Sequence, residues 1–221
     1  MTRLIACVVW VVLAAGCAHG PFTDTPPVSL ESVEPARLLE NYKSRLPQQF
    51  QLLNTVVFER SGVSFTAIGY LDINRHDNLF RVVCLNPLGV QLFELSGDRS
   101  TITTHSVLPP LMKYGDLPAV VGADIRRIFL DPAPTADAQV WRSRNSISFW
   151  QHSGPGRMQY VFAGSGHDLV EKNYYEYGET VWSVSYHDYF EINGKRYPRG
   201  IALDNHRHGY TLTVRHKELF P

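Results

Sequence analysis

The chain has 221 residues, of which 44% are hydrophobic and 19% are charged. That length and composition predict one domain with a sizeable hydrophobic core. Its 21 Lys and Arg residues balance its 21 Asp and Glu residues, so the formal net charge is zero. A neutral chain lacks the positive surface that binds nucleic acid, and this disfavours nucleic acid as a partner.

The first sixteen residues have the features of a signal peptide. Arg3 precedes an apolar run over residues 4–15, which is too short for a comfortable membrane span. The run ends in "LAAGC", and small residues directly before a Cys resemble the lipobox of bacterial lipoproteins. That resemblance implies cleavage before Cys17 and attachment of acyl chains to it. An ordinary secretory signal followed by a chance Cys is the alternative.

The lipobox also bears on location. In enterobacterial-type sorting, an Asp directly after the acylated Cys favours retention in the inner membrane, and this chain has Ala18 there. The resemblance therefore implies an outer-membrane lipoprotein that faces the periplasm and contacts membrane lipid through acylated Cys17. Each buried acyl methylene contributes about 0.8 kcal/mol, so several acyl chains would hold the protein on a bilayer almost permanently.

Cysteine usage fits this compartment. If Cys7 leaves with the signal and Cys17 is acylated, Cys84 is the one thiol left and no intramolecular disulfide can form. Cys84 lies in the strand-like run "FRVVCL", which favours a buried structural residue over a catalytic thiol.

The organisation after the signal is a linker and one domain. Residues 17–34 hold Cys17 and then a stretch rich in Pro, Ser, Thr and Gly, which predicts a flexible linker. The domain spans residues 35–221. It begins with a short helix between Pro35 and Pro47, whose apolar face comprises Leu38, Leu39, Tyr42 and Leu46.

Alternating apolar residues over 50–107 and 140–219 predict antiparallel strands in two groups. Turn residues separate the runs, and Asn193-Gly194 is a strong hairpin signal. Between the groups, Asp116 and Pro118 begin a helix as N-cap and first-turn residues. The apolar residues of that helix recur at helical spacing, at Leu117, Val121, Ile125 and Ile128.

These elements predict a mainly β fold with some helix. A single antiparallel sheet of about eleven strands must curl to bury its apolar face, which gives an incomplete, half-open β-barrel covered by one or two helices. Its concave face would form either a cavity for an elongated apolar ligand or a solid core. The candidate residues are Phe50, Leu52, Val56, Phe58, Phe65, Leu92, Ile147, Phe149, Tyr160, Phe162, Trp182 and Tyr186.

One hairpin carries a family resemblance. The stretch "LNPLGVQLFEL" places Leu88 at a turn tip, where a polar residue is usual. It resembles the corresponding hairpin of LolB, the outer-membrane receptor for lipoproteins, which shares its fold with the periplasmic carrier LolA. The order of elements and the C-terminal run "WSVSYHDYFEINGKRYPRGIALDNHRHGYTLTVRH" are also similar. The aromatic-rich "NYYEYGETVW" departs from LolB, which indicates a divergent family of uncertain cargo.

The resemblance implies a lipid carrier rather than an enzyme. It implies a monomer that receives an acylated lipoprotein, or a glycolipid or polyene-type lipid, in a hydrophobic cavity and helps place it in the outer membrane. A periplasmic LolA-like carrier is a possible donor, and no cofactor is needed. Leu88 would project from its turn and insert into the bilayer, unless it folds back on its own sheet. A structural or assembly lipoprotein that binds a protein partner is the alternative.

Other chemistry has weaker signals. "DNHRHG" could present Asp204, His206 and His208 to a metal, but a polar hairpin explains it more simply. Ser165 and His167 lie too close together in "GSGHD" for the usual catalytic triad. The tyrosines at 174, 175 and 177 could stack on a sugar or a polyene, although strand tyrosines are more often half-buried. We therefore expect neither a metal site nor catalytic residues.

Overall fold

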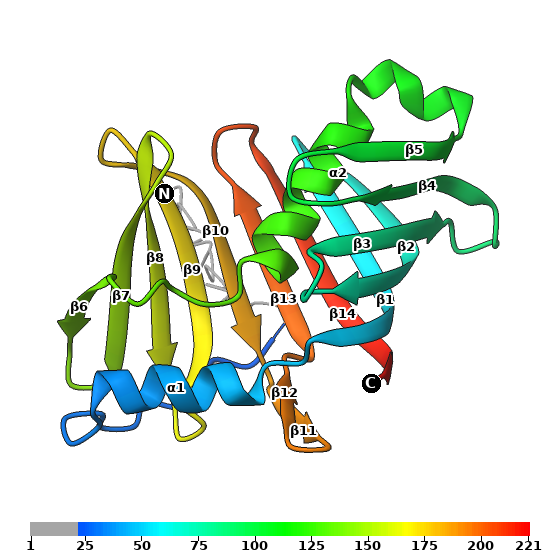
Figure 1. Ribbon diagram of the computed structural model, residues 1–221. Helices are drawn as coiled ribbons and strands as arrows, with labels where there is room; N and C mark the ends of the chain where they lie inside the picture. The colour runs from blue at the N-terminus through cyan, green and yellow to red at the C-terminus, as the bar shows by residue number, and fades with distance from the viewer. Residues whose placement is uncertain (1–21) are drawn as a thin grey trace, which may run out of the picture.

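The computed structural model describes residues 22–221, apart from the side chain of Tyr114 (Figure 1). The predicted signal peptide, Cys17 and Ala18 lie outside the described residues. The first half of the chain forms α1 (Pro35–Arg45), β1 (Gln49–Arg60), β2 (Val63–Asn74), β3 (Leu79–Leu85), β4 (Gln91–Gly97), β5 (Ile102–Val107), the 3₁₀ helix η1 (Pro109–Tyr114), α2 (Leu117–Ile125) and the short π-helical stretch η2 (Arg126–Leu130).

The second half is almost entirely strand. It forms β6 (Gln139–Arg142), β7 (Ser146–Ser153), β8 (Gly156–Ala163), β9 (Asp168–Glu176), β10 (Glu179–His187), β11 (Phe190–Ile192), β12 (Lys195–Tyr197), β13 (Gly200–Asn205) and β14 (Tyr210–Phe220). The predicted turn at Asn193-Gly194 joins β11 to β12, and both residues have positive φ, as a tight hairpin requires.

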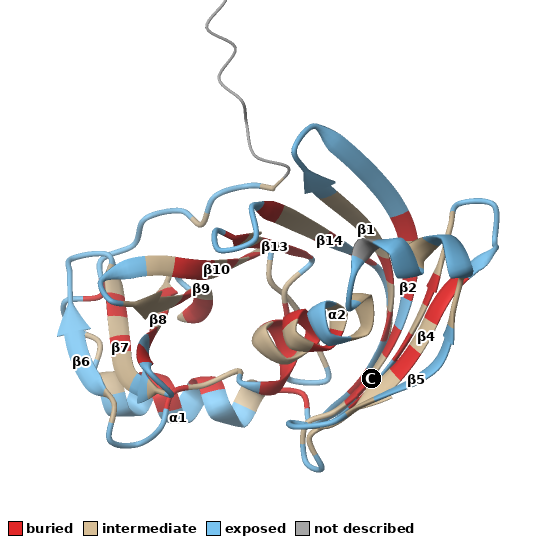
Figure 2. Cartoon of the chain, turned by 90° about the horizontal axis from the view of Figure 1, so that it is seen from above, coloured by how far each residue is buried: buried red, intermediate tan, exposed pale blue. Residues whose placement is uncertain are grey.

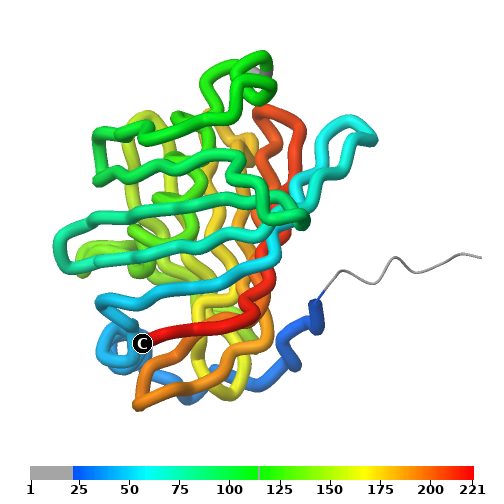
Figure 3. Tube along the Cα trace, turned by 90° about the vertical axis from the view of Figure 1, so that its right-hand side faces the viewer, coloured from blue at the N-terminus to red at the C-terminus, as the bar shows by residue number. Residues whose placement is uncertain are grey.

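Twelve of these strands make one antiparallel sheet in the order β5-β4-β3-β2-β1-β14-β13-β10-β9-β8-β7-β6. The last strand of the chain pairs with the first, from Gln51 opposite Phe220 to Arg60 opposite Tyr210, and this joins the two groups of strands (Figure 3). The sheet curves but does not close, because β5 and β6 remain as free edges (Figure 2). The predicted incomplete barrel is confirmed, with one more strand than expected.

This topology sends a helix across the concave side of the sheet. Because β5 and β6 are opposite edges, residues 108–138 between them must cross the mouth of the curve, and α2 lies inside it (Figures 1 and 2). We call Leu117–Leu130, comprising α2 and η2, the lid. The predicted helix start is confirmed, since the Asp116 carboxylate accepts a hydrogen bond from the Ala119 N–H at 3.1 Å.

Helix α1 covers another part of the same side. Glu34 caps its N-terminus by accepting a hydrogen bond from the Arg37 N–H at 2.8 Å. Tyr42 packs edge-on against Phe162 of β8, with ring centroids 4.9 Å apart. The predicted apolar face is confirmed, because Leu38, Leu39, Tyr42 and Leu46 are all buried.

The segment before α1 lies against the domain. Leu30 is completely buried, and its backbone N–H donates to the Arg144 carbonyl at 2.7 Å. Arg142 holds the same segment by donating to the Val33 carbonyl at 2.6 Å. Within residues 22–221, no helix combines the length and apolar character that crossing a membrane requires.

Candidate functional site

The concave face of the sheet is apolar and extends across both groups of strands. Of the twelve residues predicted to line it, nine are buried: Phe50, Leu52, Leu92, Ile147, Phe149, Tyr160, Phe162, Trp182 and Tyr186. Val56 and Phe58 are half-buried. Phe65 lies opposite Phe58 near the β1–β2 turn and is 40% exposed, beyond the region that the lid covers. The structure therefore brings most of this predicted set together on one covered surface.

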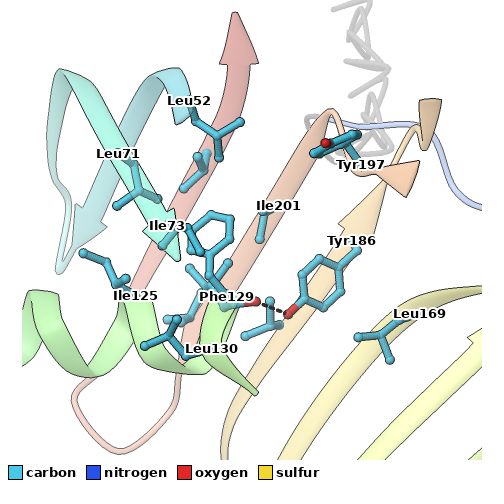
Figure 4. Close-up of a cluster of buried hydrophobic side chains, with 14 of the residues drawn as sticks. Leu52, Leu71, Ile73, Ile125, Phe129, Leu130, Leu169, Tyr186, Tyr197 and Ile201 are labelled. Carbon is cyan, nitrogen blue, oxygen red and sulfur yellow. Dashed lines mark hydrogen bonds between the residues drawn. The ribbon is translucent and has the colours of Figure 1, made fainter. Parts of the chain in front are cut away.

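The apolar side of the lid fills the space above this surface. Ile125, Phe129 and Leu130 are buried against side chains of the sheet, as Figure 4 shows. The enclosed space left beside the end of the lid is about 30 Å³, and its lining includes Phe50 and Tyr197. That is room for about one water molecule. In this lid-closed conformation that cavity is too small for a hydrocarbon chain.

Polar side chains attach the end of the lid. The last carbonyl groups of a helix have no partner within the helix, and they carry the negative end of its dipole. The Tyr186 hydroxyl donates to the Ile128 carbonyl at 2.9 Å, the contact dashed in Figure 4. The Tyr42 hydroxyl of α1 donates to the Pro132 carbonyl at 3.0 Å.

Two cations attach the same turn of the lid. Lys172 Nζ donates to the Arg127 carbonyl and to the Asp131 carbonyl, the latter at 2.8 Å. Arg75, in the β2–β3 turn, donates through Nε to the Phe129 carbonyl at 2.8 Å. Side chains from widely separated parts of the chain thus satisfy five of the six carbonyl groups from Arg127 to Pro132.

Lys172 is the unusual residue of the concave face. It lies on β9 between Tyr160 of β8 and Val184 of β10, and it is 0% exposed. Its Nζ atom is 5.8 Å from the centroid of the Tyr160 ring and 5.9 Å from that of Trp182, within the range of cation–π attraction. Burial lowers the pKa of Lys172 to about 7, although the nearby Asp131 carboxylate opposes that shift.

The cations near the end of the lid differ in how they are neutralised. Arg196 on β12 makes two contacts with the Asp168 carboxylate, one of them from Nε at 3.2 Å. No carboxylate within residues 22–221 lies within ion-pair distance of Lys172 or Arg75. Arg75 instead donates its second hydrogen bond to the Pro47 carbonyl at 2.7 Å. Both groups therefore depend on backbone oxygens.

The α2 part of the lid has its own attachments. The buried carboxylate of Asp124 accepts from the Tyr210 hydroxyl at 2.7 Å and from Arg127 Nη1 at 2.7 Å. Arg126 donates to the carbonyls of Asp98 and Thr101 in the β4–β5 turn, at 2.6 and 2.7 Å. Hydrogen bonds thus hold the lid from Asp124 to its C-terminal end, and apolar contacts pack the same part against the sheet.

The Asn86–Gly89 turn presents Leu88 to solvent. The Asn86 side chain accepts hydrogen bonds from the Leu88 and Val90 backbone N–H groups, both at 2.9 Å. Gly89 has φ +84°, a conformation that other residues rarely adopt. Leu88 is 89% exposed and does not fold back on its sheet. The turn fixes an outward-pointing apolar side chain, whose role in membrane insertion remains a prediction.

The other candidate groups do not gather into a site. Asp204 and His206 line an open groove between the β1–β2 and β13–β14 turns. Among the described residues, no three His, Cys, Asp or Glu side chains are arranged to hold a metal. Cys84 is buried on β3, and burial raises the pKa of its thiol to about 12, so the thiol stays protonated at neutral pH.

The sequence interpretation missed Lys172. A lysine in the run "LVEKNYYEY" indicates a solvent-facing position on a half-buried strand. The pairing of β8 with β9 shifts register between Val161 and Phe162, so that Leu169 and Lys172, three positions apart, are both buried. Such an irregularity reverses the alternation within the strand, and no local sequence signal reveals it.

The fold matches solved structures. A LolA superfamily protein from Nitrosomonas europaea aligns with a TM-score of 0.53 at 12% identity, covering 87% of this chain and 93% of that one. A DUF1329 family protein from Desulfovibrio piger aligns with a TM-score of 0.53 at 10% identity, covering 83% and 89%. At such identities the likeness shows the fold alone, and it confirms the predicted LolA/LolB-type architecture.

Sequence comparison gives the family. No curated protein matches the chain. A family model described as "Protein of unknown function (DUF3261)" matches residues 51–218, which include every strand of the large sheet at least in part and the whole lid. The chain belongs to the DUF3261 family, and its fold is similar to that of a solved LolA superfamily protein.

Proposed function

We propose that this protein is a lipid-anchored carrier of the outer membrane. It takes the hydrocarbon part of a lipophilic cargo onto the concave face of its sheet and helps place that cargo in the membrane, without covalent chemistry. The LolA-type fold, the continuous apolar face and the lid across it support this proposal. The cargo is an acylated lipoprotein or a lipid, and the carrier acts as a monomer.

One observation carries the proposal. Apolar side chains of the lid occupy the concave face, while hydrogen bonds at Asp124 and Ile128 hold the lid in place. A hydrocarbon chain that replaced the lid would exchange one apolar contact for another, so the net free energy of the exchange is small. Loading and release then depend on small differences in burial between donor, carrier and membrane.

Acylated Cys17 and the Leu88 turn determine where the carrier acts and how it is oriented. Acyl chains on Cys17 keep the protein on the outer membrane, facing the periplasm. Inserting Leu88 into lipid contributes roughly 1.5–3 kcal/mol, which is too little to anchor the protein. It suffices to orient the domain toward a bilayer that the anchor already holds nearby. A periplasmic LolA-like carrier would deliver the cargo.

A lid-locking disulfide tests the proposal. A Cβ atom built on Gly122 of α2 would lie 2.9 Å from Ile102 Cγ1 of β5. With a C–C bond of about 1.5 Å, the two Cβ atoms lie within roughly 4.5 Å of each other, which suits a disulfide. We would introduce Ile102→Cys and Gly122→Cys together with Cys84→Ser and follow uptake of a pyrene-labelled hexadecanoic acid.

The proposal predicts saturable uptake by the reduced protein, slow uptake by the oxidised protein and recovery after reduction. The reduced form is thus the control for the two substitutions. Equal uptake by both forms would show that the lid does not gate the site. No uptake in either form or in the unmodified protein, with co-purification of one envelope protein, would favour an assembly factor instead.

A further inference from the structure

Two buried or half-buried cations face the same turn of the lid without a carboxylate partner. Lys172 donates to the Arg127 and Asp131 carbonyls, and Arg75 donates to the Phe129 carbonyl. Arg196 lines the same small cavity as Arg75, but it already forms an ion pair with Asp168. The acceptors of Lys172 belong entirely to the lid region, which leaves when the concave face opens.

When the lid moves off the concave face, the surroundings of Lys172 and Arg75 therefore change. A charged group next to apolar surface costs several kcal/mol unless it is paired or hydrogen-bonded. Once the lid has left, Lys172 faces Tyr160 and Trp182 with no acceptor, and Arg75 keeps only the Pro47 carbonyl and its position over the Phe50 ring. The Asp131 carboxylate, whose charge acts on Lys172, follows directly on the lid.

We propose, on the basis of the function inferred above, that the cargo is an anionic amphiphile. Its head is a carboxylate or a phosphate held by Lys172 and Arg75, and its hydrocarbon chain lies on the apolar face that the lid vacates. An acid head replaces the lid carbonyls as acceptor and adds the negative charge that they lack. A neutral ester offers acceptors without that charge, so it compensates the two cations less well.

Neighbouring groups complete the head site. The Tyr186 and Tyr42 hydroxyls also donate to lid-end carbonyls, at Ile128 and Pro132. All four donors lose an acceptor when the lid leaves together with residues 131–132 that follow it, and the oxygens of a carboxylate or a phosphate accept several hydrogen bonds at once. Apolar residues continue from Lys172 across β13 to β1, where Ile201 and Leu52 are buried beside the lid, and provide surface for the chain (Figure 4).

Matched lipids test the inference. The purified full-length chain, freed of bound lipid, would be titrated with pyrene-labelled hexadecanoic acid, its methyl ester and pyrene-labelled hexadecyl phosphate. We expect the wild-type protein to bind at least one acid tenfold or more tightly than the ester, and the phosphate arm identifies which acid is preferred. Lys172→Met and Arg75→Gln should each reduce that ratio severalfold with little change in ester affinity. Lys217→Met, on the exposed part of β14, should leave the ratio unchanged.

The outcomes separate the two proposals. Absence of binding by acids and ester alike overturns the carrier function itself. Equal binding of acids and ester by the wild-type protein overturns the anionic head site and leaves the carrier intact. If Lys172→Met does not fold, the wild-type ratio and its reduction in Arg75→Gln decide the matter. An acid preference that both variants retain would assign it to other residues and contradict the proposal.

Discussion

The ammonium group of Lys172 lies 2.8 Å from the carbonyl oxygen of Asp131, directly after the lid. This contact joins the floor of the concave face to the segment that covers it. A fully buried lysine is destabilising unless it has partners, and here the partners are backbone oxygens of the lid end. The amine that fastens the lid is therefore also the group that an opened site must satisfy.

This lysine predicts a pH dependence of stability. The pKa of Lys172 is about 7 in the folded protein and near its ordinary value of 10.5 in the unfolded chain. Between these values the unfolded chain binds more protons, so the free energy of unfolding should rise with pH by about 1 kcal/mol per unit. The free energy of unfolding therefore decreases as pH falls from about 10.5 to about 7.

Urea unfolding at pH 7.5, 8.0 and 8.5 measures this slope, below the range where the buried tyrosines, whose pKa values are raised from 10.0, act in the opposite direction. Lys172→Met should flatten the slope, and Lys217→Met should keep it. A slope that is the same in wild-type protein and Lys172→Met would show that Lys172 is not the titrating group.

The Tyr210–Asp124 contact should hold the α2 part of the lid. Tyr210→Phe removes a hydrogen bond to a buried carboxylate, which should lower the free energy of unfolding by about 1.5–3 kcal/mol. Because opening breaks the same bond, uptake of pyrene-labelled hexadecanoic acid should also become faster in stopped-flow measurements. Tyr177→Phe, at a position that is 95% exposed, is the matched control. Unchanged uptake with reduced stability would mean that opening leaves this contact intact.

Leu88 should act at release and not at loading. Leu88→Glu replaces an apolar tip by a charge, so transfer of bound probe to liposomes should slow at least about tenfold while probe affinity and stability stay unchanged. Leu79→Glu, at the other end of β3 and 47% exposed, should leave transfer unaffected. Equal transfer by the Leu88 variant and wild type would remove the membrane-insertion role.

Cys17 should carry the anchor. Cys17→Ser should abolish incorporation of radiolabelled palmitate and release the protein from the outer-membrane fraction, because the cysteine that the lipobox presents for acylation is then missing. Cys7→Ser, within the predicted signal peptide, should preserve labelling. Persistent labelling of the Cys17 variant would contradict the lipobox assignment.

Local signals predicted much of the fold. Asp116 and Pro118 marked the start of the lid, Pro35 marked α1, and the Asn193-Gly194 dipeptide marked a hairpin. Each depends on a few neighbouring residues with a restricted backbone. The exposed position of Leu88 follows in the same way, since Asn86 and Gly89 fix its turn.

Features that depend on distant residues could not be predicted in this way. The strand register that buries Lys172 is set between β8 and β9, and the acceptors of Lys172 lie more than forty positions earlier in the chain. Alternation likewise placed Phe65 on the concave face but could not show that the lid stops short of it. Whether that face is open or filled depends on the lid position, which no strand pattern encodes.

A crystal structure of the protein with bound hexadecanoic acid tests the central claim most directly. The account predicts that the carboxylate lies at Lys172 and the hydrocarbon chain on the concave face against Ile201 and Leu52, with the lid displaced and the Tyr186–Ile128 hydrogen bond broken. A chain bound on the outer surface, with the lid contacts unchanged, would contradict it.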